Sequence, residues 1–151
     1  MALPIVACAP GLGDPSRFEV DEVCDFDVQE DLLVPRCATA PACHVPHEPA
    51  AGLEFVTGGL AERLLRNEAT TCDGHRLIDA ASPSDSFILT RVSAEPACDG
   101  TPIERMPLVG EPLNARELAC LTRWVESIAR EAPPIDAPAR DASTGDEDAG
   151  P

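Results

Sequence analysis

Aromatic side chains are scarce in this chain of 151 residues, which contains one Trp, four Phe and no Tyr. Because aromatics bury more apolar area than other side chains, their scarcity predicts a thin core that another group can fill. Long apolar runs are also missing, and no stretch approaches the roughly 20 residues that a membrane-spanning helix needs. A chain of this length without such a run is expected to form one soluble domain.

Lysine is absent as well, and all 11 basic residues are Arg. The chain has 27 acidic residues, which leaves a formal net charge of -16. Nucleic acids and anionic membrane surfaces bind basic protein faces, so this balance argues against both as partners. A protein partner that docks through charge should instead offer a basic face.

Seven cysteines are many for so short a chain, and they indicate an oxidising compartment or covalent cofactor chemistry. Their odd number leaves at least one unpaired. Cys8 is the natural odd one, because Leu3-Pro4-Ile5-Val6-Ala7 before it resembles the lipobox of a bacterial lipoprotein. The run is short and lacks a positive start, so a stray cysteine on an N-terminal arm is the alternative. Cys8 is thus a lipidation candidate in an exported protein, either periplasmic or membrane-anchored, and its lipid would be the only membrane contact.

Both ends of the chain lack apolar periodicity. Residues 1–19 contain many turn formers and are interpreted as a signal remnant and tether. Residues 132–151 consist largely of Pro, Ala, Asp, Ser and Gly, a composition that predicts a disordered acidic tail. The folded domain is expected between them, over residues 20–131.

Four segments of this domain have helical signals, and none alternates with a two-residue period, so an all-α fold of about four short helices with long loops is expected. The first covers residues 27–34, with Asp27 as its cap and Pro35 ending it before Cys37. The second covers residues 60–66, where leucines share one side. Both predicted helices are short.

The third helix is predicted to start at Ser82, with Pro83 in its first position. Its inward side chains are expected to be Phe87, Ile88 and Val92. The fourth has the strongest start signal, because Asn114 followed by Glu117 is a capping box. Helical spacing then continues through Leu118, Leu121, Trp124, Val125 and Ile128.

Reactive side chains concentrate in the segment Cys37-Ala38-Thr39-Ala40-Pro41-Ala42-Cys43-His44-Val45-Pro46-His47. A cysteine pair followed at once by His is typical of c-type haem attachment, in which two thiols form thioethers with the porphyrin and the His binds iron. Two residues usually separate the cysteines, whereas five separate them here. A disulfide across the loop, or a zinc site of Cys37, Cys43, His44 and His47, are the alternatives, although the spacing matches no standard zinc finger.

Met106 is the one methionine besides Met1, and it lies in the loop Arg105-Met106-Pro107-Leu108 before the last helix. A methionine that only fills a core normally lies on a helix or strand face. On a loop, its thioether is available as an iron ligand on the side of a haem opposite a His.

The order of these parts resembles class I cytochromes c, and more narrowly the cytochrome c-like domains of planctomycete and myxobacterial exported proteins. The resemblance covers residues 26–129 and is carried by Cys37…Cys43-His44, Ala50-Ala51-Gly52-Leu53-Glu54-Phe55, Ser82-Pro83-Ser84-Asp85-Ser86-Phe87-Ile88, Arg105-Met106-Pro107-Leu108, Leu113-Asn114-Ala115-Arg116-Glu117-Leu118 and Trp124-Val125. It implies one haem c held by Cys37, Cys43 and His44, with His44 and Met106 as axial iron ligands. The implied role is electron transfer to a redox partner protein.

The other four cysteines are disulfide candidates. Cys72 and Cys98 both lie in turn-like Cys-Asp-Gly segments that flank the third helix, which favours pairing them. Cys24 and Cys120 then pair with each other, since the resemblance implies that the first and last helices cross. Six core cysteines allow many connectivities, so other pairings stay open. His75 lies in a polar turn and is expected to be exposed.

The main alternative function is that of a haem-free relative, closed by disulfides, which serves as an interaction or structural module of an exported lipoprotein. An enzyme is less supported, because the chain offers no nucleophile beside a base, no Gly-rich phosphate loop and no carboxylate pair in an apolar setting. The sequence therefore favours an electron carrier that is not an enzyme.

Overall fold

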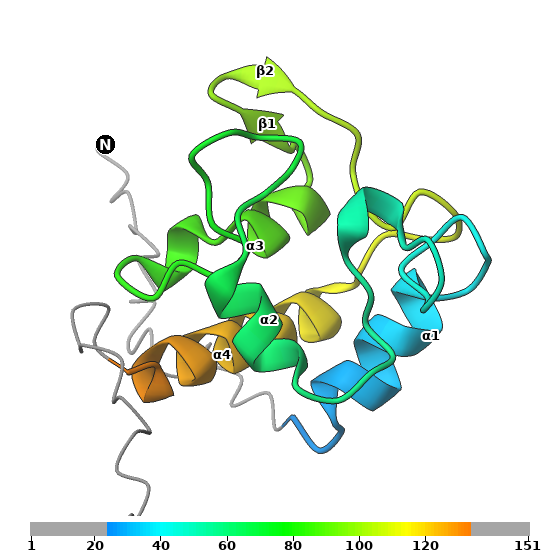
Figure 1. The fold of residues 1–151 in the computed structure, drawn as a ribbon, viewed down its shortest axis with the longest axis horizontal. Coiled ribbons are helices and arrows are strands. Elements are labelled where there is room, and N and C mark those ends of the chain that lie inside the picture. The colour runs from blue at the N-terminus through cyan, green and yellow to red at the C-terminus, as the bar shows by residue number, and fades with distance from the viewer. Residues whose placement is uncertain (1–23, 134–151) are drawn as a thin grey trace, which may run out of the picture.

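A computed structural model describes residues 24–133 of the protein. The expectations for Cys8, for the tether over residues 1–19 and for nearly all of the acidic tail lie outside this range. Within it, the chain forms four α-helices, short π and 3-10 segments, and one two-stranded sheet, joined by long loops (Figure 1). No helix between residues 24 and 133 has the length and apolarity that a bilayer span requires.

The first helical segment begins after Asp27, whose carboxylate accepts a hydrogen bond from the N–H of Glu30 at 2.8 Å. It consists of the π-helix η2 (Val28–Leu33) followed directly by α1 (Val34–Cys37). The expectation that Pro35 ends the helix before the first reactive cysteine is therefore wrong. A proline ring clashes with the carbonyl four residues before it in a regular α-helix. The wider π turn ahead of Pro35 relieves that clash, so the helix continues.

Helix α2 (Leu60–Arg66) has the predicted bounds. The third predicted helix is instead the 3-10 segment η4 (Pro83–Asp85) and then α3 (Phe87–Val92), separated by Ser86 with ψ 127°. This break has a tertiary cause, because the fully buried Ser86 hydroxyl accepts a hydrogen bond from the Asp79 N–H at 3.0 Å. The predicted inward side chains are confirmed as buried: Phe87, Ile88 and Val92.

Helix α4 (Ala115–Glu131) confirms the predicted capping box. The Asn114 side chain accepts from the Glu117 N–H at 2.9 Å, and the Glu117 carboxylate accepts from the Asn114 N–H at 2.8 Å. The helix runs along the lower side of the domain in Figure 1 and packs against η2, η4 and α3. Its apolar face is buried at Leu121, Val125 and Ile128 and only partly buried at Leu118 and Trp124.

A small hairpin of β1 (Ala97–Cys98) and β2 (Thr101–Pro102) was not expected, so the all-α prediction is confirmed only for the helices. Its turn residues Asp99 and Gly100 have φ values of 47° and 80°. Two successive positive φ angles are those of the tight turn that matches strand twist, and Asp-Gly is a strong sequence signal for it. Strands of two residues are too short to show alternation, which is why the periodicity missed them.

Two disulfides join distant parts of the domain, Cys24 to Cys120 and Cys72 to Cys98. These are the two pairs that we expected. The first ties the start of the described chain to α4, and the second ties the hairpin to the loop after α2. Between these ties lies a core mainly of aliphatic side chains, whose members with no more than 3% exposure include Leu32, Leu33, Leu60, Leu64, Ile78, Phe87, Leu121 and Val125.

Candidate functional site

A largely apolar cavity opens in the interior of the domain between η2, α3 and three loops. The space between its walls amounts to about 740 Å³, solvent at its mouth included. Its walls include Leu33, Cys37, His44, Leu53, Phe55, Leu77, Phe87, Ile88, Arg91, Val92 and Met106.

A second, smaller cavity adjoins the first and measures about 390 Å³, solvent at its mouth included. The two share Cys37, His44 and Met106. Cys43 lines this second cavity, together with Pro107 and the exposed Leu108 of the methionine loop. The loop after α1 and the loop before α4 therefore lie side by side, at the right of Figure 1. The fold thus brings all four predicted cofactor-binding residues to one place.

The five residues between the two reactive cysteines form a closed loop. The His44 N–H donates to the Cys37 carbonyl at 3.1 Å, and the Cys43 N–H donates to the Ala40 carbonyl at 2.9 Å. The Ala50 N–H then donates to the Cys43 carbonyl at 3.0 Å. These hydrogen bonds hold His44 next to Cys37 at the end of α1. The five residues between Cys37 and Cys43 therefore do not separate Cys37 from the histidine.

His44 is held in one orientation and one tautomer. Its Nδ1 lies 2.7 Å from the Leu53 carbonyl, and a carbonyl only accepts, so Nδ1 carries the proton. The Nε2 lone pair is then available for a metal, which is the arrangement that metal-binding histidines use. The ring also packs against Phe55, with 4.8 Å between centroids.

Cys37 and Cys43 are both half-buried free thiols, so the alternative disulfide between them is not formed. Burial raises the pKa of the Cys37 thiol to about 11, an effect that Arg36 opposes and Cys43 reinforces. Cys37 is therefore protonated at neutral pH. The zinc alternative is disfavoured by the geometry, because His47, its fourth ligand, lines neither cavity.

Met106 is anchored through its backbone N–H, which donates to the Arg91 carbonyl at 2.7 Å. Its side chain packs partly buried against the core and lines both cavities. This hydrogen bond joins the methionine loop to the last turn of α3. The thioether thereby reaches the same space as the ring of His44.

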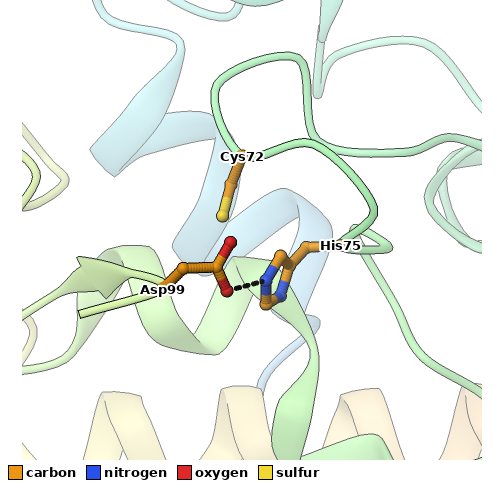
Figure 2. A group of neighbouring side chains, drawn as sticks. All are labelled: Cys72, His75 and Asp99. Atoms are coloured by element: carbon orange, nitrogen blue, oxygen red, sulfur yellow. Dashed lines mark hydrogen bonds and ion pairs between the residues drawn. The ribbon is translucent and has the colours of Figure 1, made fainter. Parts of the chain in front are cut away.

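Within residues 24–133, one group of three potential metal ligands converges, formed by Cys72, His75 and Asp99. Figure 2 shows the three side chains, with His75 Nε2 3.0 Å from Asp99 Oδ1. The Cys72 sulfur is bonded to Cys98, so it cannot act as a thiolate ligand while that disulfide is intact. The group instead fastens the hairpin turn to the loop of residues 72–75. The expectation of an exposed His75 is wrong in part, since its side chain is 39% exposed and bonded to Asp99.

Two arginines near the cavities were not singled out from the sequence. Arg36 donates through Nη2 to the carbonyls of Glu111 and Pro112 at 2.9 and 3.0 Å, and pairs with Glu117 at 3.5 Å. It therefore ties α1 to the start of α4. Arg91 lines the first cavity beside Met106. No sequence motif marks either residue, because their roles depend on segments far away in the chain.

No family model, curated protein or solved structure matches this chain. Its function must accordingly be argued from the cavity and the side chains that line it.

Proposed function

We propose that this domain is a small c-type cytochrome, with a cytochrome c-like fold, that binds one haem c and carries single electrons. The observation that carries the proposal is that Cys37, Cys43, His44 and Met106 line two adjoining cavities. A haem c takes two thiols for its thioether bonds and two axial ligands for its iron. Those four groups are the ones gathered here.

The walls of the site suit such a group. Aliphatic and aromatic side chains supply most of the lining, which keeps water from a flat apolar ring. The hydrogen bond from His44 to the Leu53 carbonyl directs the free ring nitrogen and raises its basicity. A methionine thioether is a soft ligand that favours the reduced metal. The haem, when bound, supplies the reversible one-electron change at iron.

The compartment of the protein and its redox partner are part of the same proposal. Two disulfides within the described residues support an oxidising compartment and hence export, to the periplasm or to a membrane through a lipid on Cys8. The net charge of -16 supports a redox partner with a basic face.

A haem-free interaction module is the second candidate function. Its supporting observation is that Cys24–Cys120 and Cys72–Cys98 already close the domain without any cofactor. On this alternative, the residues that line the cavity are packing residues of a loosely packed core and bind no cofactor.

An absorption spectrum of protein matured in a bacterial periplasm with haem-attachment machinery separates the two. We expect a reduced haem band that survives acid-acetone extraction, because thioether bonds hold the haem covalently. His44→Ala should abolish that band. The matched control is His47→Ala, which removes an exposed histidine that lines neither cavity and should retain it. A colourless, folded parent protein would contradict the cytochrome and support the interaction module.

Met106→Ala tests the second axial ligand. The variant should keep covalent haem, open one coordination position, bind imidazole and show a lower reduction potential than the parent. Glu104→Gln, on the same loop but exposed and lining neither cavity, is the control and should leave the spectrum unchanged. A haem-loaded Met106→Ala protein with the parental spectrum would contradict the assignment of Met106 as the second axial ligand.

A further inference from the structure

The cluster of Cys72, His75 and Asp99 is assembled from two separate loops. Cys72 and His75 share one turn, in which the His75 N–H donates to the Cys72 carbonyl at 3.2 Å and the Ala69 N–H donates to the His75 carbonyl at 2.7 Å. Asp99 lies in the turn of the hairpin, directly after Cys98, which is bonded to Cys72. The ligand atoms of the three clustered residues lie within 4.8 Å of one another (Figure 2). Sulfur, nitrogen and oxygen donors therefore converge at one point.

The separations in this cluster suit a tetrahedral zinc ion. At Zn–N and Zn–O bond lengths of about 2.0–2.1 Å, a nitrogen and an oxygen ligand at the tetrahedral angle lie about 3.3 Å apart. His75 Nε2 lies 3.0 Å from Asp99 Oδ1, so only a small movement is needed to place an ion between them. A mixed set of sulfur, nitrogen and oxygen donors also favours zinc over magnesium and calcium, which take oxygen ligands.

Cys98 provides a fourth donor once its bond to Cys72 is broken. Its position beside the cluster is fixed by the hairpin, in which Cys98 pairs with Thr101 and the Ile103 N–H donates to the Pro96 carbonyl at 3.0 Å. Structural zinc is almost always four-coordinate, with cysteine, histidine and carboxylate as its protein ligands. Two thiolates, one imidazole and one carboxylate make such a set.

The cluster also has a path by which a metal ion can enter. Cys72 is 2% exposed, whereas the side chains of His75 and Asp99 are 39% and 75% exposed. The sulfur therefore lies on the protein side of the cluster, and the imidazole and carboxylate face the solvent. Neither these three residues nor Cys98 line the two cavities, so the cluster is separate from the proposed haem site.

We propose that the dithiol form of this domain binds one zinc ion through Cys72, Cys98, His75 and Asp99, and that the ion and the Cys72–Cys98 disulfide exclude each other. A dithiol reductant breaks the S–S bond by exchange: it gives two electrons and two protons to the two sulfurs and becomes a disulfide itself. When Zn²⁺ binds, both thiols release their protons to solvent, and the ring proton of His75 resides on Nδ1. Oxidation by another disulfide withdraws two electrons from the thiolates, re-forms the S–S bond and releases Zn²⁺.

The test uses the full chain, reduced with a dithiol, desalted without oxygen, and titrated with Co²⁺ and then with Zn²⁺. Cobalt reports on its ligands, because thiolate-to-cobalt charge transfer and intense visible bands mark a tetrahedral site that contains sulfur. The reduced parent should take up cobalt with both signals, and zinc should displace the cobalt. The oxidised parent, whose Cys72 and Cys98 sulfurs are bonded to each other, should show neither signal.

Two of the ligands have matched controls elsewhere in the chain. His75→Ala and Asp99→Asn should each weaken zinc binding about a hundredfold or more, since even outer-shell partners of a metal contribute about tenfold to hundredfold. His47→Ala changes an exposed histidine, and Asp73→Asn changes the exposed aspartate of the other Cys-Asp-Gly turn. Both of these variants should retain the parental affinity.

Cysteine variants separate this site from the other thiols of the reduced chain. Cys37→Ser/Cys43→Ser removes the two free thiols near the cavities and should retain the cobalt signals. Cys98→Ser, purified under oxidising conditions, frees the Cys72 thiol while the other disulfide stays closed, so its fold does not depend on full reduction. It should bind zinc through three ligands, about tenfold or more weakly than the reduced parent, and lose that binding when His75 is also replaced.

The outcomes decide the inference independently of the haem. Cobalt signals that His75→Ala and Asp99→Asn abolish, and that the control variants keep, support it. Signals that persist in both ligand variants, that appear equally in the oxidised parent, or that are missing from both the reduced parent and Cys98→Ser overturn it. If circular dichroism shows the reduced parent to be unfolded, zinc binding by Cys98→Ser supports the inference and failure to bind overturns it.

Discussion

The thiol of Cys37 lies where a negative charge is poorly solvated. Burial raises its pKa to about 11, although Arg36 next to it acts in the opposite direction. Desolvation therefore outweighs the attraction of a neighbouring cation whose guanidinium is already engaged with Glu117. Cys37 in the folded apo-protein is a weak nucleophile even though it lines a cavity.

We predict slow alkylation of Cys37 in the folded apo-protein. At pH 8, a thiol of pKa about 11 has about a hundredfold less thiolate than one at the usual 9.0. Iodoacetamide labelling, followed for the Cys37 peptide by mass spectrometry, should therefore accelerate with pH to beyond pH 10. The same chain unfolded in urea with its disulfides intact is the control. Equal rates for folded and unfolded chains at pH 8 would contradict burial of the thiol.

The same pKa shift predicts a change of stability with pH. Between about pH 9 and 11 the unfolded state releases the Cys37 proton while the folded state retains it. Deprotonation thus stabilises the unfolded state, so this contribution to stability is present below pH 9 and is lost as pH rises through this window.

At the scale of single elements, α4 combines a strong local start signal with one deeply buried side. Its capping box depends on residues three positions apart, so sequence alone locates the start of the helix. The depth of each apolar side chain depends on its neighbours in space. Leu121 has 0% exposure, whereas Leu118 and Trp124 are partly exposed, a difference that the helical spacing did not predict.

We predict that Leu121→Ala lowers the free energy of unfolding by about 2–5 kcal/mol, as expected for a large-to-small change in a core. Leu118→Ala and Trp124→Ala should cost less, because part of each side chain already contacts water. Urea unfolding followed by circular dichroism gives the values. The control Glu126→Ala changes an exposed residue of the same helix and should stay within about 0.5 kcal/mol. A smaller loss for Leu121→Ala than for Leu118→Ala would be inconsistent with this packing.

Helix ends were harder to predict than helix positions. Pro35 was expected to terminate the first helix, but the π turn before it accommodates the ring. Ser86 was expected inside a continuous helix, but its hydroxyl accepts the Asp79 N–H and breaks that helix. In both cases the sequence rule for a helix end considers only the nearest residues. The observed end depends on a π turn or on a hydrogen bond to a residue outside that range.

For the molecule as a whole, two disulfides compensate for a small and hollow core. Cys24–Cys120 closes a sequence separation of 96 residues, and Cys72–Cys98 closes one of 26. Cross-links stabilise mainly by restricting the unfolded chain, and longer loops lose more entropy. The long connection through Cys120 should therefore matter more for stability than the shorter one at the hairpin.

We predict that the double variant Cys24→Ala/Cys120→Ala loses about 4–5 kcal/mol of stability, and Cys72→Ala/Cys98→Ala about 3.5 kcal/mol. Thermal and urea unfolding of both variants and the parent, under identical oxidising conditions, give the comparison. Equal or inverted losses would show that local packing, rather than chain entropy, sets the contribution of each bond.

Sequence alone determined the features that act within a few residues: the bounds of α2, the capping box of α4, and the Cys43-His44 adjacency on which the haem proposal rests. It also favoured the two disulfide pairs, which it could not separate from other connectivities. Only the tertiary structure decided that Met106 reaches the cavity of His44 and that Leu53 sets the histidine tautomer. The physical reason is range, because caps and turns are satisfied by near neighbours, whereas a binding site depends on which distant segments pack together.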